Sequence, residues 1–481
     1  MLVSKNFKLD RNQSTLDFLD VHIDKDIQVF VDPAALRSLK TDWGHHCVSL
    51  LQNYFDTVLT SIRNNQHAKA RELLSCLSER NEFHIGYSKG RSRGHALGPI
   101  SAANIWASLV KSKAATTGLL QDLEDTILFV DGFGPDMLSD AVCNIIRGPL
   151  IEYTQQSCLY YGIPLTPDVS SGPIWNPLSE EWEQSLISLP TTKHGPLIFI
   201  PKVIARIKQT YGSDDYYRHF LMPVLQQHHK DINSSLVHVL KSKKNKGVKK
   251  VYKKDLYEKY GADKIASAKL TNEHPAALTN YKATKKSQPS HPLDHIALAK
   301  LENIPAPDFS ALLASVTAVQ PGKAGATAYE HAIEKLLSAL LYPALSFPVK
   351  QDEIHNGRKR IDITYVNTSK DGFFEWLSRN HSASHIYVEC KNYGKEIGNP
   401  EIDQLAGRFS PSRGQVGILV VRSVAQKKTL LQRCKDTAND SRGFILVLDD
   451  ADLKTLIGQR QAIIYGAGEN ALYQQFKALV S

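Results

Sequence analysis

The sequence of 481 residues has few cysteines and no long apolar run. Its six cysteines are scattered, and none of them forms a Cys-x-x-Cys pair. This excludes a dense disulfide framework and a cysteine-based zinc site, and it predicts free thiols. No uninterrupted apolar stretch approaches the roughly 18 residues that a membrane span requires. The first residues, MLVSKNFKLDRNQS, lack the apolar segment of a signal peptide, so we expect a soluble, cytoplasmic protein.

Acidic residues are also fewer than basic ones. The chain has 49 Asp and Glu against 58 Lys and Arg, which gives a formal net charge of +9. This balance is compatible with a polyanionic partner but does not identify one, because it is spread over the whole chain. The hydrophobic share of 42% indicates a globular protein, and the length allows two or three domains.

The sequence predicts an N-terminal half with both helices and strands, and a C-terminal domain in which the pattern of helices and strands is clearer. Residues 1–165 are expected to form a mixed α/β domain and residues 166–290 a mostly helical region. The helical region contains KSKKNKGVKKVYKK at 241–254, with eight lysines and no acid. Polar and proline-containing stretches make residues 291–324 a predicted linker, which leaves 325–481 as a separate domain.

The C-terminal domain is predicted to follow the order α-β-β-β-α-β-α-β. Its first helix, 326–341, should end at Tyr342-Pro343, because proline cannot continue a helix. Alternating or continuous apolar residues predict the strands, and longer periodic stretches predict the helices. The strands are expected at about 345–352, 359–366, 385–391, 416–421 and 443–448, and the later helices at about 400–409, 424–436 and 450–458.

Two of these strands carry charged side chains where burial is expected. In RIDITYV, Asp362 sits among apolar residues, and in HIYVECK, Glu389 and Lys391 project from the same side of the strand. Moving a carboxylate from water into the protein interior costs free energy unless the carboxylate is paired or holds a cation. If the two strands are neighbours, Asp362, Glu389 and Lys391 converge on one point.

A divalent cation suits such a cluster, because two close carboxylates repel each other. Mg²⁺, with Mn²⁺ as a substitute, binds through one or two carboxylates, and the backbone carbonyl of Cys390 is a further candidate ligand. Lys391 would then orient a water or neutralise charge on a phosphoryl transition state. The alternative is a structural Asp362 beside an exposed Glu389–Lys391 pair, which contributes about 0–1 kcal/mol.

Together these residues resemble the PD-(D/E)XK superfamily of restriction-endonuclease-like nucleases. Ile361-Asp362 followed by VECK at 388–391 matches its pattern, with Ile361 in place of the usual proline. The helix YEHAIEKLL offers Glu330, or Glu334 one turn later, as an acid of the site, and its start is similar to that of Mrr-like domains. The implied fold is α/β: an α-β-β-β-α-β core with a central mixed sheet flanked by helices, beside a separate N-terminal mixed α/β region that resembles no family closely.

The helix after the lysine strand adds to the resemblance. Asn399 is a fitting N-cap, and Pro400 and Glu401 suit the first turn. Gln404 and Arg408 lie four residues apart on one face. A glutamine on this helix is a recurring active-site neighbour in Mrr-like members, so the resemblance adds Gln404 to the candidate catalytic residues.

The resemblance implies a metal-dependent endonuclease that hydrolyses DNA phosphodiester bonds. It implies a role in bacterial restriction or anti-phage defence, with residues 1–290 sensing, gating or selecting the substrate. The expected partner is DNA or RNA, and a homo-oligomer or a defence-system protein is a further expectation. Two alternatives stay open: a nucleic-acid-binding module without catalysis, and an endonuclease that cleaves RNA such as tRNA.

Basic side chains outside this cluster are candidate contacts to a nucleic-acid backbone. The basic residues of the glycine-rich loop are equally compatible with a solvated loop, and a lysine-rich run is more typical of one. The candidates are Lys89, Arg91 and Arg93 in a glycine-rich loop, Lys243, Lys244, Lys249 and Lys250 in the lysine-rich stretch, and Arg358, Arg360 and Arg408 in the C-terminal domain.

The stretch FVDGFGPDMLSDAVCNIIRG, 129–148, is the most distinctive of the N-terminal half. It predicts a strand, a glycine turn and then a helix. Asp131, Asp136 and Asp140 are compatible with a metal or phosphate site at the start of that helix. The pattern favours the simpler interpretation, a tight turn with Ser139 or Asp136 capping the helix.

Overall fold

The apolar side chains of the chain gather in two separate cores. The computed structural model describes residues 1–77, 80–86, 107–109, 114–240, 247–288, 290–354, 359–393, 397–466 and 468–481. One core is formed by side chains between Val3 and Leu298 with Tyr342, and the other by side chains between Val316 and Leu479. The predicted boundary at residue 165 is therefore not a boundary between cores, because residues on both sides of it pack together.

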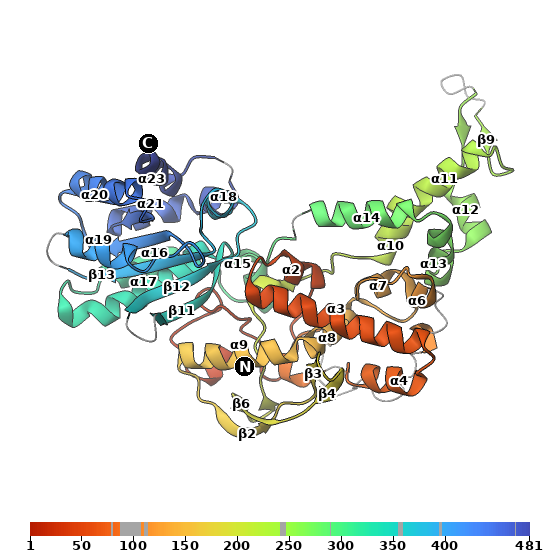
Figure 1. Ribbon diagram of the computed structural model, residues 1–481, viewed down its shortest axis with the longest axis horizontal. Coiled ribbons are helices and arrows are strands. Elements are labelled where there is room, and N and C mark those ends of the chain that lie inside the picture. Colours follow the sequence, from red (N-terminus) through yellow and green to blue (C-terminus); the bar gives the residue numbers. More distant parts are fainter. Residues whose placement is uncertain are drawn as a thin grey trace.

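The second core is built around a mixed five-stranded sheet, as predicted for the C-terminal domain. Its order is β11-β12-β13-β14-β15, with antiparallel pairs up to β13 and parallel pairs after it. β14 is buried at every position, because helices cover both faces of the sheet (Figure 1). The strands are β11 (Leu345–Ile354), β12 (Lys359–Asn367), β13 (His385–Lys391), β14 (Val416–Val421) and β15 (Phe444–Leu448).

Helices flank this sheet in nearly the predicted order. α17 (Ala326–Leu341) precedes β11, and α19 (Asn399–Ala406) follows β13. Three helices were not predicted: α18 (Gly372–Asn380), which lies between β12 and β13, and two that follow the last predicted helix. The remaining helices are α20 (Lys427–Asn439), α21 (Asp450–Gly458), α22 (Arg460–Tyr465) and α23 (Ala471–Val480).

The start of α19 differs from the prediction by one residue. Gly398, not Asn399, is the N-cap, and the Glu401 side chain accepts a hydrogen bond from the Gly398 N–H at 3.0 Å. Pro400 lies in the first turn as expected. The hydrogen bond between the Gly398 N–H and the Glu401 side chain fixes the first residue of the helix. A glycine can occupy this N-cap position because Glu401, and not the side chain of the N-cap residue, provides the capping hydrogen bond.

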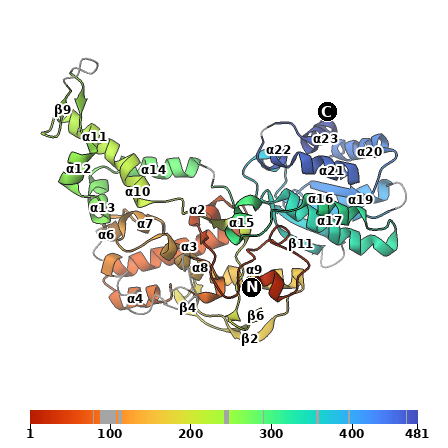
Figure 2. The same cartoon turned by 180° about the vertical axis from the view of Figure 1, so that it is seen from behind.

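The predicted linker, 291–324, is largely helical. It contains α15 (His295–Glu302) and α16 (Phe309–Thr317), and α16 packs against α17. The ring of His295 bonds to the carbonyl of Ala339 at 2.8 Å. In Figure 1 and from behind in Figure 2, α15 lies where the two parts of the molecule meet. The stretch is a packed connection because Leu298 and Ala299 of α15 and Val316 of α16 are buried.

The N-terminal part is mostly helical, with short two-stranded sheets. Residues 125–129 form a helix, α7 (Asp125–Phe129), and not the predicted strand. A short, fully buried apolar run has no periodicity that separates strand from helix. α8 (Pro135–Ile145) has Gly134 as N-cap with no side-chain cap, and Ser139 accepts a hydrogen bond from the Val31 N–H instead.

Two further helices of this part matter below. α3 (Asp42–Arg63) and α9 (Arg147–Tyr161) lie beside the C-terminal sheet at their ends. Within the described part of the chain, no helix is long and apolar enough to cross a membrane.

Candidate active site

Asp362 and Glu389 meet where β12 runs alongside the end of β13. Ile363 lies opposite Val388 in this antiparallel pair, which brings Asp362 next to Glu389 and Cys390. The backbone N–H of Cys390 donates a hydrogen bond to Asp362 Oδ2 at 2.8 Å. Alternation along both strands places Asp362 and Glu389 on the face opposite Ile361 and Ile363, which are fully buried.

Glu389 is buried and is neutralised by two cations. Lys391 Nζ donates to Glu389 Oε1 at 2.7 Å, and Arg408 donates to Glu389 Oε2. The Glu389 residue is 1% exposed and Arg408 6% exposed, so both charges are largely shielded from water. Charge-assisted hydrogen bonds of this kind are among the stronger ones, so they hold the Glu389 carboxylate in a fixed position.

Lys391 connects Glu389 to α19. Its Nζ also donates to Gln404 Oε1 at 3.3 Å. Burial alone lowers the pKa of Lys391, but the charge and hydrogen bond of Glu389, with Asp362, raise it overall. Lys391 is therefore a cation in this site, and Gln404 lies beside it as the resemblance implies.

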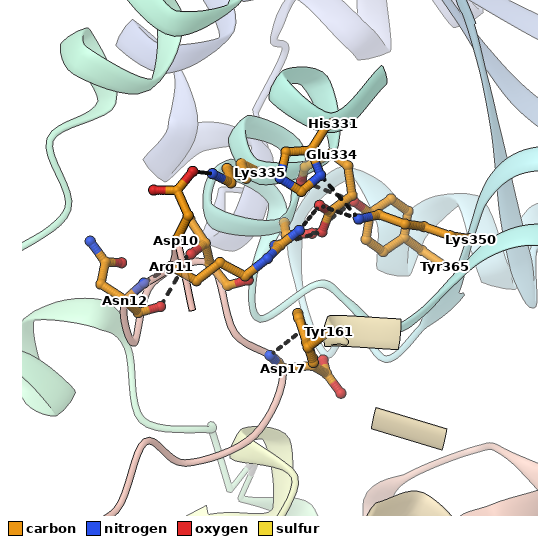
Figure 3. Close-up of polar contacts among 12 residues, drawn as sticks. Asp10, Arg11, Asn12, Asp17, Tyr161, His331, Glu334, Lys335, Lys350 and Tyr365 are labelled. Carbon is orange, nitrogen blue, oxygen red and sulfur yellow. Dashed lines mark hydrogen bonds and ion pairs between the residues drawn. The ribbon is translucent and has the colours of Figure 1, made fainter. Parts of the chain in front are cut away.

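The two glutamates of α17 have different surroundings. Glu330 accepts a hydrogen bond from Gln351 Nε2 at 2.9 Å, and its charge acts on Asp362. Glu334 points to the N-terminal part, where Arg11 donates to both of its oxygens and Lys350 Nζ lies 3.2 Å from Oε2 (Figure 3). Of the two candidates, Glu330 is the acid that lies near Asp362.

Burial and the neighbouring carboxylates raise the pKa of Asp362 to about 6. Burial is the largest cause, followed by the charge of Glu389, and Glu330 adds to it. The hydrogen bond from the Cys390 N–H and the charge of Lys391 act in the opposite direction. Uncompensated negative charge at Asp362 is what a bound cation would relieve.

The protein side chains alone do not form a closed metal cage. Among the residues that the structure describes, no group of three or more His, Cys, Asp or Glu side chains is arranged to hold a metal ion. Two carboxylates and a carbonyl are nevertheless the sparse donor set that Mg²⁺ takes when waters and substrate complete its shell. The donors of Asp362, Glu389 and Cys390 fit that pattern.

The basic candidates are dispersed. Lys249 and Lys250 lie on the exposed strand β10 (Lys249–Lys250), which pairs with β9 (His238–Val239) far from the C-terminal sheet (Figure 1). Arg360 is exposed on β12, near the site. Lys89, Arg91, Arg93, Lys243, Lys244 and Arg358 lie outside the described residues.

Sequence reasoning missed three contacts of the candidate glutamates. It assigned Arg408 to nucleic-acid contacts and did not anticipate its pairing with Glu389, although the i,i+4 spacing to Gln404 pointed to the same face. Gln351 and Lys350 were not singled out at all. Their consecutive positions on β11 hold the two glutamates of α17, a pairing that no local pattern reveals.

Two family models match the chain. Residues 326–457 match a family described as restriction endonuclease. Residues 8–212 match a domain of unknown function, DUF8370, and this match also crosses the predicted boundary at 165. No curated protein and no solved structure gives a significant match.

Proposed function

We propose that this chain, whose C-terminal domain is a restriction-endonuclease domain, is a metal-dependent endonuclease that hydrolyses DNA phosphodiester bonds. The convergence of Asp362, Glu389 and Lys391 at the meeting point of β12 and β13 is the observation that supports it. The proposal includes Mg²⁺ as cofactor, with Mn²⁺ as a substitute.

The charge of the site supports a divalent cation. The ionisable side chains are Asp362, Glu389, Glu330, Lys391 and Arg408. Three carboxylates against two cations leave one net negative charge, which a divalent ion converts to a positive one. Asp362, Glu389 and the Cys390 carbonyl would hold the ion, which supplies polarisation of a phosphoryl oxygen and acidification of a bound water.

The chain's own residues then bind and orient the substrate. Lys391 and Arg408 are preformed donors beside the carboxylates, where they can neutralise charge on a phosphate oxygen. Gln404 holds the Lys391 ammonium in place and can accept a hydrogen bond from a water. Gln351 fixes Glu330 near Asp362, where its charge favours retention of the cation.

The family resemblance extends the proposal to the biological setting. It favours bacterial restriction or anti-phage defence in the cytoplasm, with the N-terminal part selecting the substrate or gating cleavage. A homo-oligomer or a partner protein would complete such a system. These statements depend on the family and not on the chemistry of the site.

The direct test is cleavage of linear, supercoiled and single-stranded DNA, and of RNA, by the purified chain with Mg²⁺, Mn²⁺ or EDTA. We expect metal-dependent cleavage that Glu389→Gln and Lys391→Ala each reduce by about 100-fold or more. Lys427→Ala is the matched control, because Lys427 also pairs with carboxylates, at 3.0 Å from Asp449, but its ion pairs are with Asp449 and Asp452 and not with the carboxylates of the site. Cleavage that is indifferent to EDTA, or equal in all variants, contradicts the proposal.

The same assay separates the two glutamates of α17. Glu330→Gln is expected to reduce cleavage by roughly 10–100-fold, as for a residue that supports the metal ligands without binding the metal itself. The variant should fold normally. Glu334→Gln should instead lower stability, because Arg11 and Lys350 lose their counter-charge. Faster cleavage of RNA than of DNA would reassign the substrate, and tight salt-dependent binding without any cleavage would favour the binding module.

A further inference from the structure

β11, the edge strand of the C-terminal sheet, is irregular where it approaches the candidate active site. Ser346 lies opposite Val366 of β12. Val349, three positions later, lies opposite Thr364, only two positions from Val366, so β11 holds one extra residue here. Such a bulge changes the direction in which the side chains beside it point, and bulges are common next to active sites for this reason.

Two residues of β11 have a strained backbone. The φ of Phe347, within the bulge, is +52°, and that of Gln351 is +49°. Residues with large side chains rarely adopt this left-handed conformation, because the Cβ atom crowds the neighbouring backbone. Strain of this kind costs free energy and persists only where surrounding contacts hold it. The contacts of these two residues therefore show what fixes the shape of β11.

The N-terminal part holds the first of these residues, Phe347. The Phe347 N–H donates a hydrogen bond to Asp17 at 3.0 Å, and the Tyr153 hydroxyl donates to the same carboxylate at 2.7 Å. The Phe347 ring packs against Trp43 of α3, with ring centroids 5.5 Å apart, and edge-on against Tyr153 of α9 at 5.7 Å. Both the main chain and the ring of Phe347 are therefore fixed by the N-terminal part.

The second of these residues, Gln351, contacts the candidate acid of the active site. Gln351 Nε2 donates a hydrogen bond to Glu330 of α17 at 2.9 Å. The preceding residue, Lys350, lies with its Nζ 3.2 Å from Oε2 of Glu334 on the same helix (Figure 3). Consecutive side chains of a regular strand point to opposite faces, so a regular β11 would not direct both of them to one helix. The irregular backbone of β11 accounts for the two contacts.

The N-terminal part also holds α17 itself. Arg11 donates to both carboxylate oxygens of Glu334, whose side chain is fully buried (Figure 3). The Lys350 ammonium lies over the ring of Tyr160 of α9, 4.7 Å from its centroid. The N-terminal part therefore contacts both α17 and β11, the two elements that the hydrogen bond of Glu330 joins.

We propose that the N-terminal part is a positioning element of the nuclease site: it fixes β11 at Phe347, and this places Gln351 against Glu330. Trp43 is then a positioning residue, which acts on the site through β11 without contact with metal or substrate. The inference rests on the proposed nuclease function, in which the charge of Glu330 favours retention of the cation. It gives a role to the region that matches a domain of unknown function.

The experiment measures binding of Mn²⁺ by the full chain, with electron paramagnetic resonance of the free ion as the signal. Trp43→Ala removes one of the rings that hold Phe347, and we expect it to weaken Mn²⁺ binding by roughly fivefold, as Gln351→Ala does. The double variant should bind no more weakly than Gln351→Ala alone, because both changes break the same link. Trp43→Phe keeps a ring at this position and should restore binding to within about twofold of the wild type.

Trp182→Ala is the matched control. Trp182 of β4 (Glu181–Glu183) is also half-buried in the N-terminal part, and its indole N–H, like that of Trp43, donates to a backbone carbonyl. Its ring packs against Tyr54 and Trp175 of the N-terminal core. The control should therefore lose a similar amount of stability and leave Mn²⁺ binding within about twofold of the wild type.

Hydrogen exchange over residues 345–354, measured by mass spectrometry, gives a readout that does not involve the metal. It should be faster in Trp43→Ala than in the wild type or Trp182→Ala, because β11 loses a contact that holds its strained backbone. Additive losses in the double variant, or equal behaviour of the two tryptophan variants, would overturn the positioning role. Faster exchange in Trp43→Ala without Mn²⁺ binding by any of the proteins would instead overturn only the proposed nuclease function.

Discussion

Two buried glutamates of this chain have opposite protonation behaviour. Burial raises the pKa of Glu334, but the charges and hydrogen bonds of Arg11 and Lys350 lower it overall. Glu302 has no such partner: both of its carboxyl oxygens lack a hydrogen bond to any described residue. Burial, with the charge of Asp20, raises the pKa of Glu302 to about 8. Both carboxyl groups are buried, so the positively charged side chains beside each of them, and not burial itself, decide which one ionises.

The protonated state of Glu302 predicts a dependence of stability on pH. Its pKa is about 8 in the folded chain and 4.5 when the side chain is fully solvated, so between these values the folded state holds a proton that the unfolded state has lost. The free energy of unfolding should therefore fall as pH rises from about 5 to 8, by at most about 1.4 kcal/mol per pH unit from this group.

Glu302→Gln should remove this contribution. We expect its denaturation midpoint to fall less with pH than that of the wild type, so that the variant is the more stable protein near pH 8. Denaturant titrations of both proteins at pH 5.5, 6.5 and 7.5 give the difference, in which other titrating groups cancel. Parallel pH profiles for the two proteins would contradict the assignment.

At the scale of elements, close packing around Phe409 ties α19 to the sheet. Phe409 follows α19 and stacks on Tyr387 of β13, with ring centroids 5.9 Å apart. Gly443, just before β15, allows this approach: a Cβ there would lie 2.3 Å from the Phe409 ring, and its φ is +109°. Since Arg408 precedes Phe409, this contact also sets where Arg408 meets Glu389.

Gly443→Ala should therefore be costly. We expect it to lower the free energy of unfolding by about 2 kcal/mol or more, from a strained backbone and a clash with Phe409, and to reduce cleavage. Gly458→Ala is the control, because nothing lies within 4 Å of its added Cβ and its φ is not positive. Chemical denaturation should place it within about 1 kcal/mol of the wild type. Similar losses in both variants would show that the packing at Phe409 is not responsible.

At the scale of the whole molecule, a short N-terminal segment docks on the C-terminal domain. Arg11 pairs with Glu334 and Asp10 with Lys335, on consecutive positions of α17 (Figure 3). Asp17 accepts a hydrogen bond from the Phe347 N–H of β11 at 3.0 Å. The two pairs on α17 differ in burial: the Arg11 and Glu334 side chains are 5% and 0% exposed, whereas Asp10 is 96% exposed.

This difference gives a matched pair of variants. Arg11→Met should lower the free energy of unfolding by about 3–5 kcal/mol, because Glu334 keeps a buried charge without its main partner. Lys335→Met should cost less than about 1 kcal/mol, since its partner is solvated. Adding Glu334→Gln to Arg11→Met should recover much of the loss. Denaturation of the four proteins checks this, and equal effects of the two single variants would contradict it.

The sequence by itself determined the local features of this protein. Alternation in RIDITYV and HIYVECK was sufficient to predict the strands and to place Asp362, Glu389 and Lys391 on one face. The spacing from Pro400 to Gln404 was sufficient for the helix behind them. These features depend on neighbours within a few positions, which is the range over which periodicity and propensity act.

Only the tertiary structure decided between alternatives that are locally equivalent. Glu330 and Glu334 lie one turn apart on α17, and the partner that distinguishes them, Arg11, is 323 positions away from Glu334. The same holds for the pairing of Arg408 with Glu389, the helix at Asp125–Phe129 and the common core on both sides of residue 165. Burial and charge pairing between distant segments set these outcomes, and neither is encoded in the pattern of any one segment.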